Sequence, residues 1–321
     1  MTKSEKGYVP KEGFLSGLLE GISDLKVDGM PDFDLYELSP LLDSSNMAVA
    51  EWNKIGEKIY SLYDKYDGFV ILHGTDTMAY TASSLSFMLE NVDKPIVLTG
   101  SQIPLCEIRS DGRDNLITSM IIAATGKVKE VCLYFGGKLL RGNRATKISA
   151  DGLLAFDSPN IQPLAEAGIN IRYLPTTSPK RANLPFSFCP FSEVPIGVLK
   201  VFPGINFSLF DAVMTEKLRG VVLETFGSGN VPSEGNALLP IIRSAFAAGA
   251  VITVCSQCPA GTVSLGAYAA SSELLSAGAV SGYDMTTEAA VAKLYYLFSK
   301  GYSKEKIKEL MEQNLCGELS K

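Results

Sequence analysis

Six short runs along the chain are apolar at nearly every position, instead of at every second position. They cover residues 68–73, 96–99, 131–135, 196–202, 220–223 and 251–255. Strands that are buried on both faces of a parallel sheet have this continuous apolar pattern. The runs therefore predict the core strands of parallel sheets.

Between these runs, apolar side chains recur at helical spacing. Two such sets are Trp52, Ile55, Ile59 and Leu62, and Val291, Leu294, Tyr295 and Phe298. Apolar positions three and four residues apart share one face of a helix, which then packs against a core. Because strands and helices alternate, the sequence predicts an α/β fold with right-handed crossovers.

The segment 176–195 interrupts this alternation. It contains four prolines and has no sustained helical period, so we interpret it as a linker. Residues 1–175 then form a larger N-terminal domain, a mostly parallel sheet flanked by helices, which carries the candidate catalytic residues. Residues 196–321 form a smaller C-terminal α/β domain.

Charge and histidine content exclude several function classes. The 321 residues carry a net charge of −6 without a basic run, which argues against a nucleic-acid partner. The uncharged stretch 244–272 has polar residues and a proline at its centre, so we do not expect it to span a membrane. His73 is the single histidine, so a zinc site built on two or three histidines is impossible.

The sharpest motif is GFVILHGTDTM at residues 68–78, in which a buried strand leads into Gly74 and then into a helix. Ligand sites in open α/β sheets lie at the carboxyl ends of strands, which is where Thr75, Asp76 and Thr77 are placed. The structural alternative is that one of these residues only caps the helix. A cap made by one of them does not exclude catalysis by another.

Two further clusters carry weaker signals. The loop of Asp43, Ser44 and Ser45 precedes the helix around Trp52; it either binds a small ligand or provides an N-cap, and the cap is the favoured interpretation. Lys147 lies among small and apolar residues, and a lysine desolvated in such surroundings can lose its proton and act as a base. Most lysines are solvated surface residues, so the residues alone favour a solvated Lys147.

Taken together, the motifs resemble the L-asparaginase/glutaminase family, and most of all its cytoplasmic type I branch. The main match is HGTDTMAYTASSLSFMLENVDKPIVLTGSQIP at residues 73–104. Shorter matches, in the order of the family, are DSSNM at 43–47, RGNRATKISADG at 141–152, FGSGNVP at 226–232, SQCPAG at 256–261 and NLCGEL at 314–319. The resemblance therefore extends over essentially the whole chain.

The resemblance implies an enzyme that hydrolyses the side-chain amide of L-asparagine to aspartate and ammonia through a threonine nucleophile. Thr75 would supply the reactive hydroxyl, Lys147 would take or relay its proton, and Asp76 would complete this group. Asp76 would also bind the substrate ammonium, while Ser44 and the loop Asp43–Ser45 would hold the α-carboxylate.

The same resemblance assigns roles to the backbone and to the single histidine. Backbone N–H groups of the turn at Gly74 and Thr75 would stabilise the tetrahedral oxyanion. Neither a metal nor an organic cofactor is needed for this chemistry. His73 then becomes a buried residue at the end of a strand with a structural hydrogen bond.

The chain departs from the family pattern at its start. Family members begin with a strand and a T-G-G-T turn that supplies a nucleophilic threonine, and a flexible loop with a tyrosine follows. Residues 1–10 resemble the start of that loop, with Tyr8 as its catalytic tyrosine, and the T-G-G-T turn is absent. Either the chain start is mis-assigned or trimmed, or the protein lacks its primary nucleophile. Because a lost strand would expose backbone edges, we favour the first explanation.

Two alternative functions remain open. Without the primary threonine, the protein would be a catalytically impaired asparagine-binding protein. The second alternative is a glutaminase-like subunit of a tRNA-dependent amidotransferase, a related branch that needs a partner and usually an additional N-terminal domain. The resemblance further implies a cytoplasmic homodimer or homotetramer, and it leaves open allosteric regulation and the choice between asparagine and glutamine.

Overall fold

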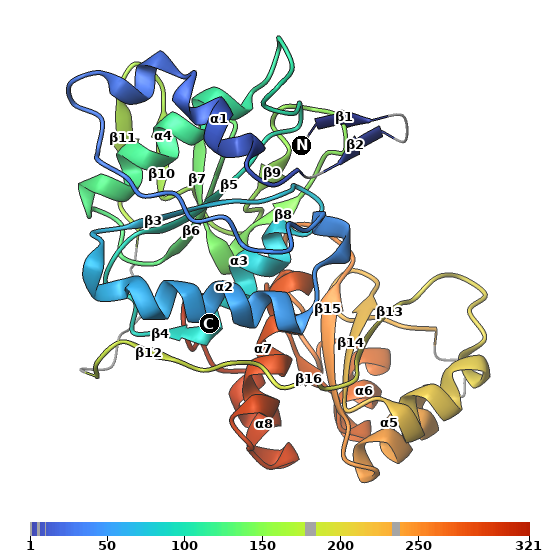
Figure 1. The fold of residues 1–321 in the computed structure, drawn as a ribbon. Helices are drawn as coiled ribbons and strands as arrows, with labels where there is room; N and C mark the ends of the chain where they lie inside the picture. The colour runs from blue at the N-terminus through green and yellow to red at the C-terminus, as the bar shows by residue number, and fades with distance from the viewer. Residues whose placement is uncertain (1, 5–6, 10, 177–183, 233–237) are drawn as a thin grey trace. The chain divides into compact units, whose positions relative to one another are not determined.

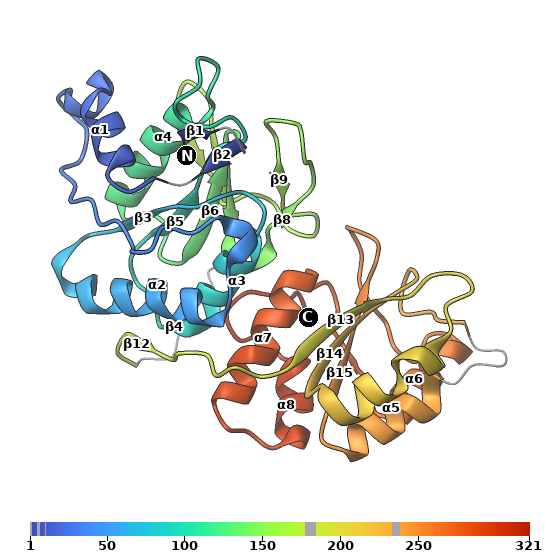
Figure 2. The same ribbon diagram turned by 45° about the vertical axis from the view of Figure 1, so that its right-hand side comes forward.

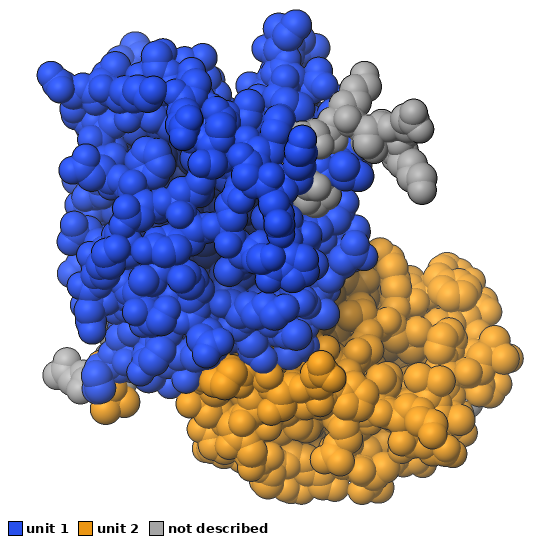
Figure 3. All heavy atoms as spheres, viewed as in Figure 1, with its two compact units in different colours: residues 1–158, 162–177, 185–188 blue, residues 159–161, 178–184, 189–321 orange. Residues whose placement is uncertain are grey.

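The fold is described by a computed structural model for residues 2–4, 7–9, 11–176, 184–232 and 238–321. These residues form two compact units, coloured separately in Figure 3. The first unit comprises the described residues up to 158 with 162–176 and 185–188, and the second comprises 159–161, 184 and those of 189–321. Of the predicted linker 176–195, residues 177–183 lie outside the described residues. None of the described helices is long and apolar enough to cross a membrane.

A six-stranded sheet in the order β11-β10-β7-β6-β5-β3 forms the centre of the first unit (Figures 1 and 2). The three parallel strands are β3 (Phe69–Leu72), β5 (Ile96–Thr99) and β6 (Val131–Phe135). Antiparallel pairing adds β7 (Lys138–Arg141), β10 (Ala165–Ala167) and β11 (Ile171–Tyr173). Val70 lies opposite Val97, which in turn lies opposite Cys132. The carboxyl ends of β3 and β5 therefore meet at one edge of the sheet, where the motif loops begin.

Helices cover both faces of this sheet (Figures 1 and 2). On one face Ile122 and Ala123 of α4 pack with Val97 and Cys132 in one buried cluster. On the opposite face lie α2 and α3 (Figures 1 and 2). The helices of the unit are α1 (Phe14–Glu20), α2 (Val49–Leu62), α3 (Met78–Met88) and α4 (Gly112–Thr125). Its 3₁₀ turns are η1 (Ser23–Lys26), η2 (Ser44–Asn46), η3 (Tyr63–Lys65) and η4 (Gly142–Arg144).

Three two-stranded antiparallel ribbons complete the first unit. They are β1 (Thr2–Ser4) with β2 (Gly7–Val9), β4 (Leu89–Glu90) with β12 (Ser187–Phe188), and β8 (Thr146–Lys147) with β9 (Phe156–Asp157). The β8–β9 ribbon follows β7 and η4, and it carries Lys147 at the end of its first strand. It is therefore the element that positions the candidate lysine.

The second unit has a four-stranded sheet in the order β13-β14-β15-β16, in which every pair is parallel. The strands are β13 (Ile196–Lys200), β14 (Gly220–Thr225), β15 (Val251–Ser256) and β16 (Val280–Ser281). Helices α5 and α6 lie on one face and α7 and α8 on the other (Figure 2). The helical segments are η5 (Phe207–Phe210), the π-helical turn η6 (Val213–Lys217), α5 (Leu238–Ala247), α6 (Ala269–Ala277), α7 (Thr287–Ser299) and α8 (Lys304–Met311).

The predicted α/β fold with two domains is confirmed, and each of the six apolar runs contains a strand. Strands β5 and β6 are buried at every residue, as their pattern predicts. Strands β3 and β13 are less buried than their pattern predicts, because each is an edge strand with a single neighbour in its sheet. Leu72 of β3 is 37% exposed and Val198 of β13 is 48% exposed. The domain boundaries at residues 175 and 196 stay predictions.

Candidate functional site

The loop between β3 and α3 is the centre of the site. His73 continues the line of β3 by donating its backbone N–H to the carbonyl oxygen of Thr99, at 2.9 Å. The backbone segments that follow β3 and β5 lie so close together that a Cβ at Gly100 would lie 2.2 Å from the carbonyl oxygen of His73. Only glycine fits at such a close approach, so β3 and β5 place the loops that follow them side by side.

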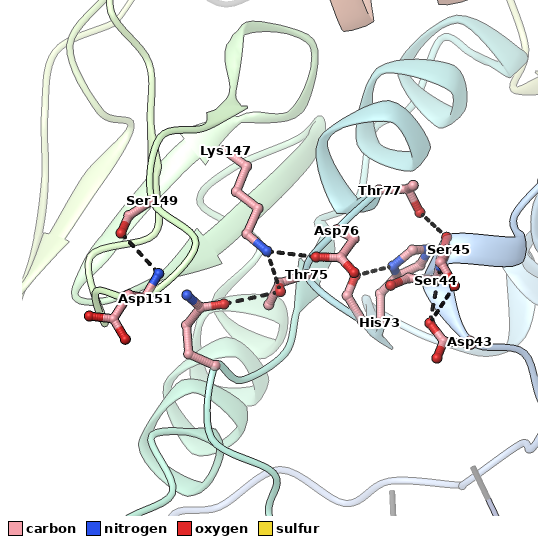
Figure 4. Close-up of polar contacts among 12 residues, drawn as sticks. Asp43, Ser44, Ser45, His73, Thr75, Asp76, Thr77, Lys147, Ser149 and Asp151 are labelled. Carbon is pink, nitrogen blue, oxygen red and sulfur yellow. Dashed lines mark hydrogen bonds and ion pairs between the residues drawn. The ribbon is translucent and has the colours of Figure 1, made fainter. Parts of the chain in front are cut away.

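The loop Asp43–Asn46 packs against this motif loop (Figure 4). A Cβ at Gly74 would lie 2.5 Å from Ser44 Oγ, so the glycine permits the contact. Thr77 Oγ1 donates a hydrogen bond to the carbonyl oxygen of Ser44 at 2.7 Å, and Ser44 is buried at this junction. The loops 43–46 and 73–77, which lie apart in the sequence, therefore pack together, and we call them the loop cluster.

Lys147 reaches the cluster from the β8–β9 ribbon (Figure 4). Its Nζ donates to Thr75 Oγ1 at 2.9 Å and to Asp76 Oδ1 at 2.8 Å. The Lys147 side chain is 20% exposed, whereas the Asp76 side chain is 64% exposed. The interpretation of Lys147 as a solvated surface lysine is therefore wrong, because its tertiary contacts hold it in an ion pair. Asp76 keeps a face open to a ligand.

Gln102 is a residue of the site that the sequence interpretation missed. Thr75 Oγ1 donates to Gln102 Oε1 at 3.0 Å, while Lys147 donates to the same hydroxyl oxygen. Gln102 Nε2 donates to the carbonyl oxygen of Gly152 at 3.2 Å, which orients the amide. A signal was present in the sequence, because Gln102 follows the run 96–99, whose strand is the parallel neighbour of β3.

The capping alternatives have different outcomes for the two loops. Asp43 Oδ1 accepts hydrogen bonds from the backbone N–H and the hydroxyl of Ser45, both at 3.1 Å, and so caps the turn η2. At the start of α3 the N-cap residue is Thr77, whose side chain makes no capping hydrogen bond. The first loop therefore caps its own turn and not helix α2, whose N-cap is Ala48 without a side-chain hydrogen bond, so the favoured interpretation as the N-cap of that helix is wrong. Its role in ligand binding stays a prediction. At α3 the capping alternative allowed any of residues 75–77, and Thr77, which occupies the N-cap position, does not cap the helix through its side chain.

Comparison with known proteins places this site in a family. Residues 1–178 match the family model described as Asparaginase, N-terminal, and residues 195–311 match the Glutaminase/Asparaginase C-terminal domain. The chain belongs to the asparaginase family. The resemblance predicted from the motifs is confirmed, and the contacts of Lys147 with Thr75 and Asp76 lie within the N-terminal asparaginase match.

Individual asparaginases are similar to the chain over its whole length. L-asparaginase 1 of Escherichia coli K12 is 46% identical over 320 residues, which are 100% of this chain and 94% of that protein. The crystal structure of L-asparaginase I from Vibrio cholerae is 44% identical with a TM-score of 0.91, covering 100% of this chain and 95% of that one. A glutamyl-tRNA(Gln) amidotransferase protein of Pyrococcus abyssi is more distant, at 33% identity over 86% of this chain and 65% of its own length.

Tyr8, which the asparaginase resemblance predicts to be catalytic, has a different partner. It lies on β2, and its hydroxyl donates to Glu107 Oε1 at 2.7 Å. This hydrogen bond to the carboxylate raises the pKa of Tyr8. The structure thus brings Thr75, Asp76 and Lys147 together, whereas the Tyr8 hydroxyl is hydrogen-bonded to Glu107 and not to any of these three residues. A catalytic role for Tyr8 stays a prediction.

Metal binding by a protein requires several side chains that can act as ligands to lie close together. Within the ranges that the structure describes, no group of three or more His, Cys, Asp or Glu residues could hold one. Hydrolysis of an amide by a threonine, as the asparaginase resemblance implies it, uses a hydroxyl and a base. The expectation that neither a metal nor an organic cofactor is needed stays a prediction.

His73 lies beside the site as a half-buried side chain whose pKa is perturbed. Burial lowers its pKa from the ordinary value of 6.5, and a hydrogen bond to Gly74 opposes this effect. The unfolded chain therefore binds the proton more readily than the folded one. We expect the free energy of unfolding to fall as the pH drops below 6.5, the ordinary pKa of the ring.

Urea unfolding at about pH 7 and about pH 5 measures this effect, with the fluorescence of Trp52, the single tryptophan, as the signal. The matched variant is His73→Gln, which cannot titrate and is expected to lose less stability than the wild type between the two pH values. Equal losses in the two proteins would contradict the prediction.

Proposed function

We propose that this chain is an L-asparagine amidohydrolase, which converts the side-chain amide of asparagine to aspartate and ammonia. The observation that carries the proposal is the contact of Lys147 Nζ with Thr75 Oγ1 at 2.9 Å and with Asp76 Oδ1 at 2.8 Å. A threonine hydroxyl is a weak nucleophile until an adjacent base takes its proton, and Lys147 is the basic side chain in hydrogen-bond contact with the Thr75 oxygen. The Escherichia coli and Vibrio cholerae relatives, both named as asparaginases, support the same reaction.

In the proposed first step, the Thr75 oxygen attacks the amide carbon while its proton passes to Lys147, which at the same time gives one of its own protons to Asp76. The tetrahedral intermediate then collapses, the C–N bond breaks, and the proton is relayed back to the departing ammonia. Water hydrolyses the resulting ester and releases aspartate, with Lys147 and Asp76 again relaying one proton. The backbone N–H of Thr75 stabilises the oxyanion in both steps.

The same proposal assigns the two ends of the substrate to two charged or polar segments. The exposed Asp76 carboxylate binds the α-ammonium group, next to the Lys147 amine that it already contacts. Ser44 and the loop Asp43–Ser45 bind the α-carboxylate. Charge-assisted contacts at both ends hold the amide carbon beside the Thr75 hydroxyl, which lowers the entropic part of the barrier.

Ammonia release from L-asparagine by this chain, compared with the variants Thr75→Ala and Thr75→Ser, tests the proposal. We expect Thr75→Ala to lower kcat about 10³-fold, because no hydroxyl is left for Lys147 to activate. Thr75→Ser keeps a hydroxyl on the same backbone and is expected to retain a measurable part of kcat. A coupled ammonia assay measures all three proteins.

Each outcome has a clear meaning. A kcat of Thr75→Ala close to that of the wild type would assign the reaction to another nucleophile. A folded chain that L-asparagine stabilises against heat, but that releases no ammonia, would instead be an asparagine-binding protein with impaired catalysis. L-glutamine assayed in parallel measures the tolerance for one additional methylene, which a pocket discriminates only modestly.

We also propose a cytoplasmic homodimer or homotetramer. All six cysteines lie in the described residues as free thiols, and reduced thiols are typical of a cytosolic protein. The assembly is carried over from the family resemblance. Light scattering coupled to size-exclusion chromatography measures the mass of the assembly, and a mass of about one chain of 34.5 kDa would contradict it.

A further inference from the structure

A chain of hydrogen bonds, buried at Trp52 and Thr81 and half-buried at His73, leads from helix α2 to the motif loop. Trp52 Nε1 on α2 donates to Thr81 Oγ1 on α3 at 3.1 Å. Thr81 Oγ1 lies 2.9 Å from His73 Nε2, and His73 Nδ1 lies 2.7 Å from the carbonyl oxygen of Gly74 (His73 is drawn in Figure 4). Thr81 is 0% exposed and Trp52 is 7% exposed. The chain therefore ends at the peptide bond that joins Gly74 to Thr75.

The chemistry of these groups allows one arrangement of their protons. A carbonyl oxygen only accepts, so the His73 nitrogen that faces Gly74 must carry the N–H. A neutral imidazole has a single N–H, which leaves Nε2 to accept the hydroxyl proton of Thr81. Trp52, which only donates, then bonds to a lone pair of the same hydroxyl. Burial lowers the pKa of His73 and so favours the neutral ring that this arrangement needs.

We infer that His73 is a positioning residue, which sets the direction of the Thr75 backbone N–H through the carbonyl of Gly74. A trans peptide bond is planar, so its C=O and N–H point in opposite directions, and a held carbonyl holds the N–H as well. In the part of the chain that the structure describes, the Thr75 N–H has no hydrogen-bond acceptor. It is therefore available to the oxyanion of the proposed hydrolysis, on which this inference rests.

Thr81→Val tests the inference, because valine has the shape of threonine but lacks the hydroxyl that holds His73. We expect kcat for L-asparagine to fall about 10- to 100-fold, because a misdirected oxyanion donor acts only in the transition state. KM is expected to change less than about threefold, because the two ends of the substrate are bound elsewhere. Thr81→Ser keeps the hydroxyl and is expected to restore most of kcat.

The matched control is Thr125→Val. It removes the hydroxyl of a threonine on α4 that donates to the carbonyl oxygen of Ile122, away from the site. Its kcat and KM are expected to equal those of the wild type. An unchanged kcat in Thr81→Val, or a kcat loss in Thr81→Ser as large as in Thr81→Val, would overturn the inference.

A second measurement does not depend on turnover or on a variant that must fold. Because His73 is the single histidine, nitrogen NMR of protein with isotope-labelled histidine reports one imidazole. We expect the tautomer protonated at Nδ1, which donates to Gly74. The tautomer protonated at Nε2 would overturn the inference, because two acceptors would then face each other across the contact with Gly74.

The two measurements separate this inference from the proposed function. If the wild type releases no ammonia, the proposed hydrolysis fails, and the tautomer of His73 still decides whether the Gly74 carbonyl is held as inferred. If the wild type hydrolyses L-asparagine and Thr81→Val does so equally well, the hydrolysis stands and the positioning role is overturned.

Discussion

Lys147→Met is expected to lower kcat for L-asparagine hydrolysis about 10⁴-fold, the upper end of the range for loss of an acid–base group. Methionine is similar in length but has no nitrogen that takes a proton. The Thr75 hydroxyl then loses its base, and Asp76 loses the cation that lies 2.8 Å from its Oδ1. Because both effects fall on the same step, the loss should appear in kcat more than in KM, as measured by ammonia release.

Lys65→Met is the matched control for this prediction. Lys65 also donates to an aspartate of the first unit, Asp34, at 3.0 Å, but it belongs to η3 and lies outside both the loop cluster and the β8–β9 ribbon. Its kcat is expected to stay within about twofold of the wild type. The double variant Lys147→Met with Thr75→Ala should be no slower than the slower single variant, because groups that act as a unit are not additive. Losses that multiply would contradict a shared catalytic group.

Lys293→Met is expected to lower the free energy of unfolding of the second unit by about 3–5 kcal/mol. Lys293 on α7 and Glu318 form an ion pair at 2.6 Å, and both side chains are 0% exposed. Lys293 Nζ also donates to the carbonyl oxygens of Met311 and Gln313, which ties the end of the chain to α7. Burial lowers the pKa of Lys293 in spite of the neighbouring carboxylate. The variant removes the positive charge that balances the negative charge of the buried Glu318 carboxylate.

Urea unfolding followed by far-ultraviolet circular dichroism measures this loss, while Trp52 fluorescence reports on the first unit alone. Lys306→Met is the matched control, because it removes an exposed lysine of α8 that pairs with Glu309, and it is expected to change stability little. Adding Glu318→Gln to Lys293→Met should recover part of the loss, since the amide carries no charge. An unchanged urea midpoint in Lys293→Met would contradict the prediction.

The central strands of both sheets are predictable from the sequence, because burial on both faces requires apolar residues at every position. This holds for β5, β6, β14 and β15. The same pattern does not tell which strand ends a sheet, since β3 and β13 are equally apolar in sequence and yet partly exposed. It also gives no sign of the antiparallel extension by β7, β10 and β11, whose three or four residues are too few to show a period.

Some residues of the candidate site can likewise be identified from the sequence, whereas others are recognised only from their tertiary contacts. Thr75 and Asp76 are adjacent at the end of a strand, so a local motif identifies them. Lys147 lies 72 positions further along, and its chemistry depends on burial and contacts that residue type does not reveal. Gln102 was missed for a related reason, because only the parallel pairing of β3 with β5 brings its amide to the Thr75 hydroxyl.

By itself, the sequence determined the fold class, the family and the residue types available for chemistry, including a single histidine that excludes a histidine-built zinc site. The tertiary structure alone decided which side chains meet: Lys147 with Thr75 and Asp76, Gln102 with Thr75, and Trp52 through Thr81 with His73. The physical reason is that periodicity and motifs record local backbone preference and burial. A hydrogen bond between distant segments depends instead on which strands become neighbours and how closely their loops pack.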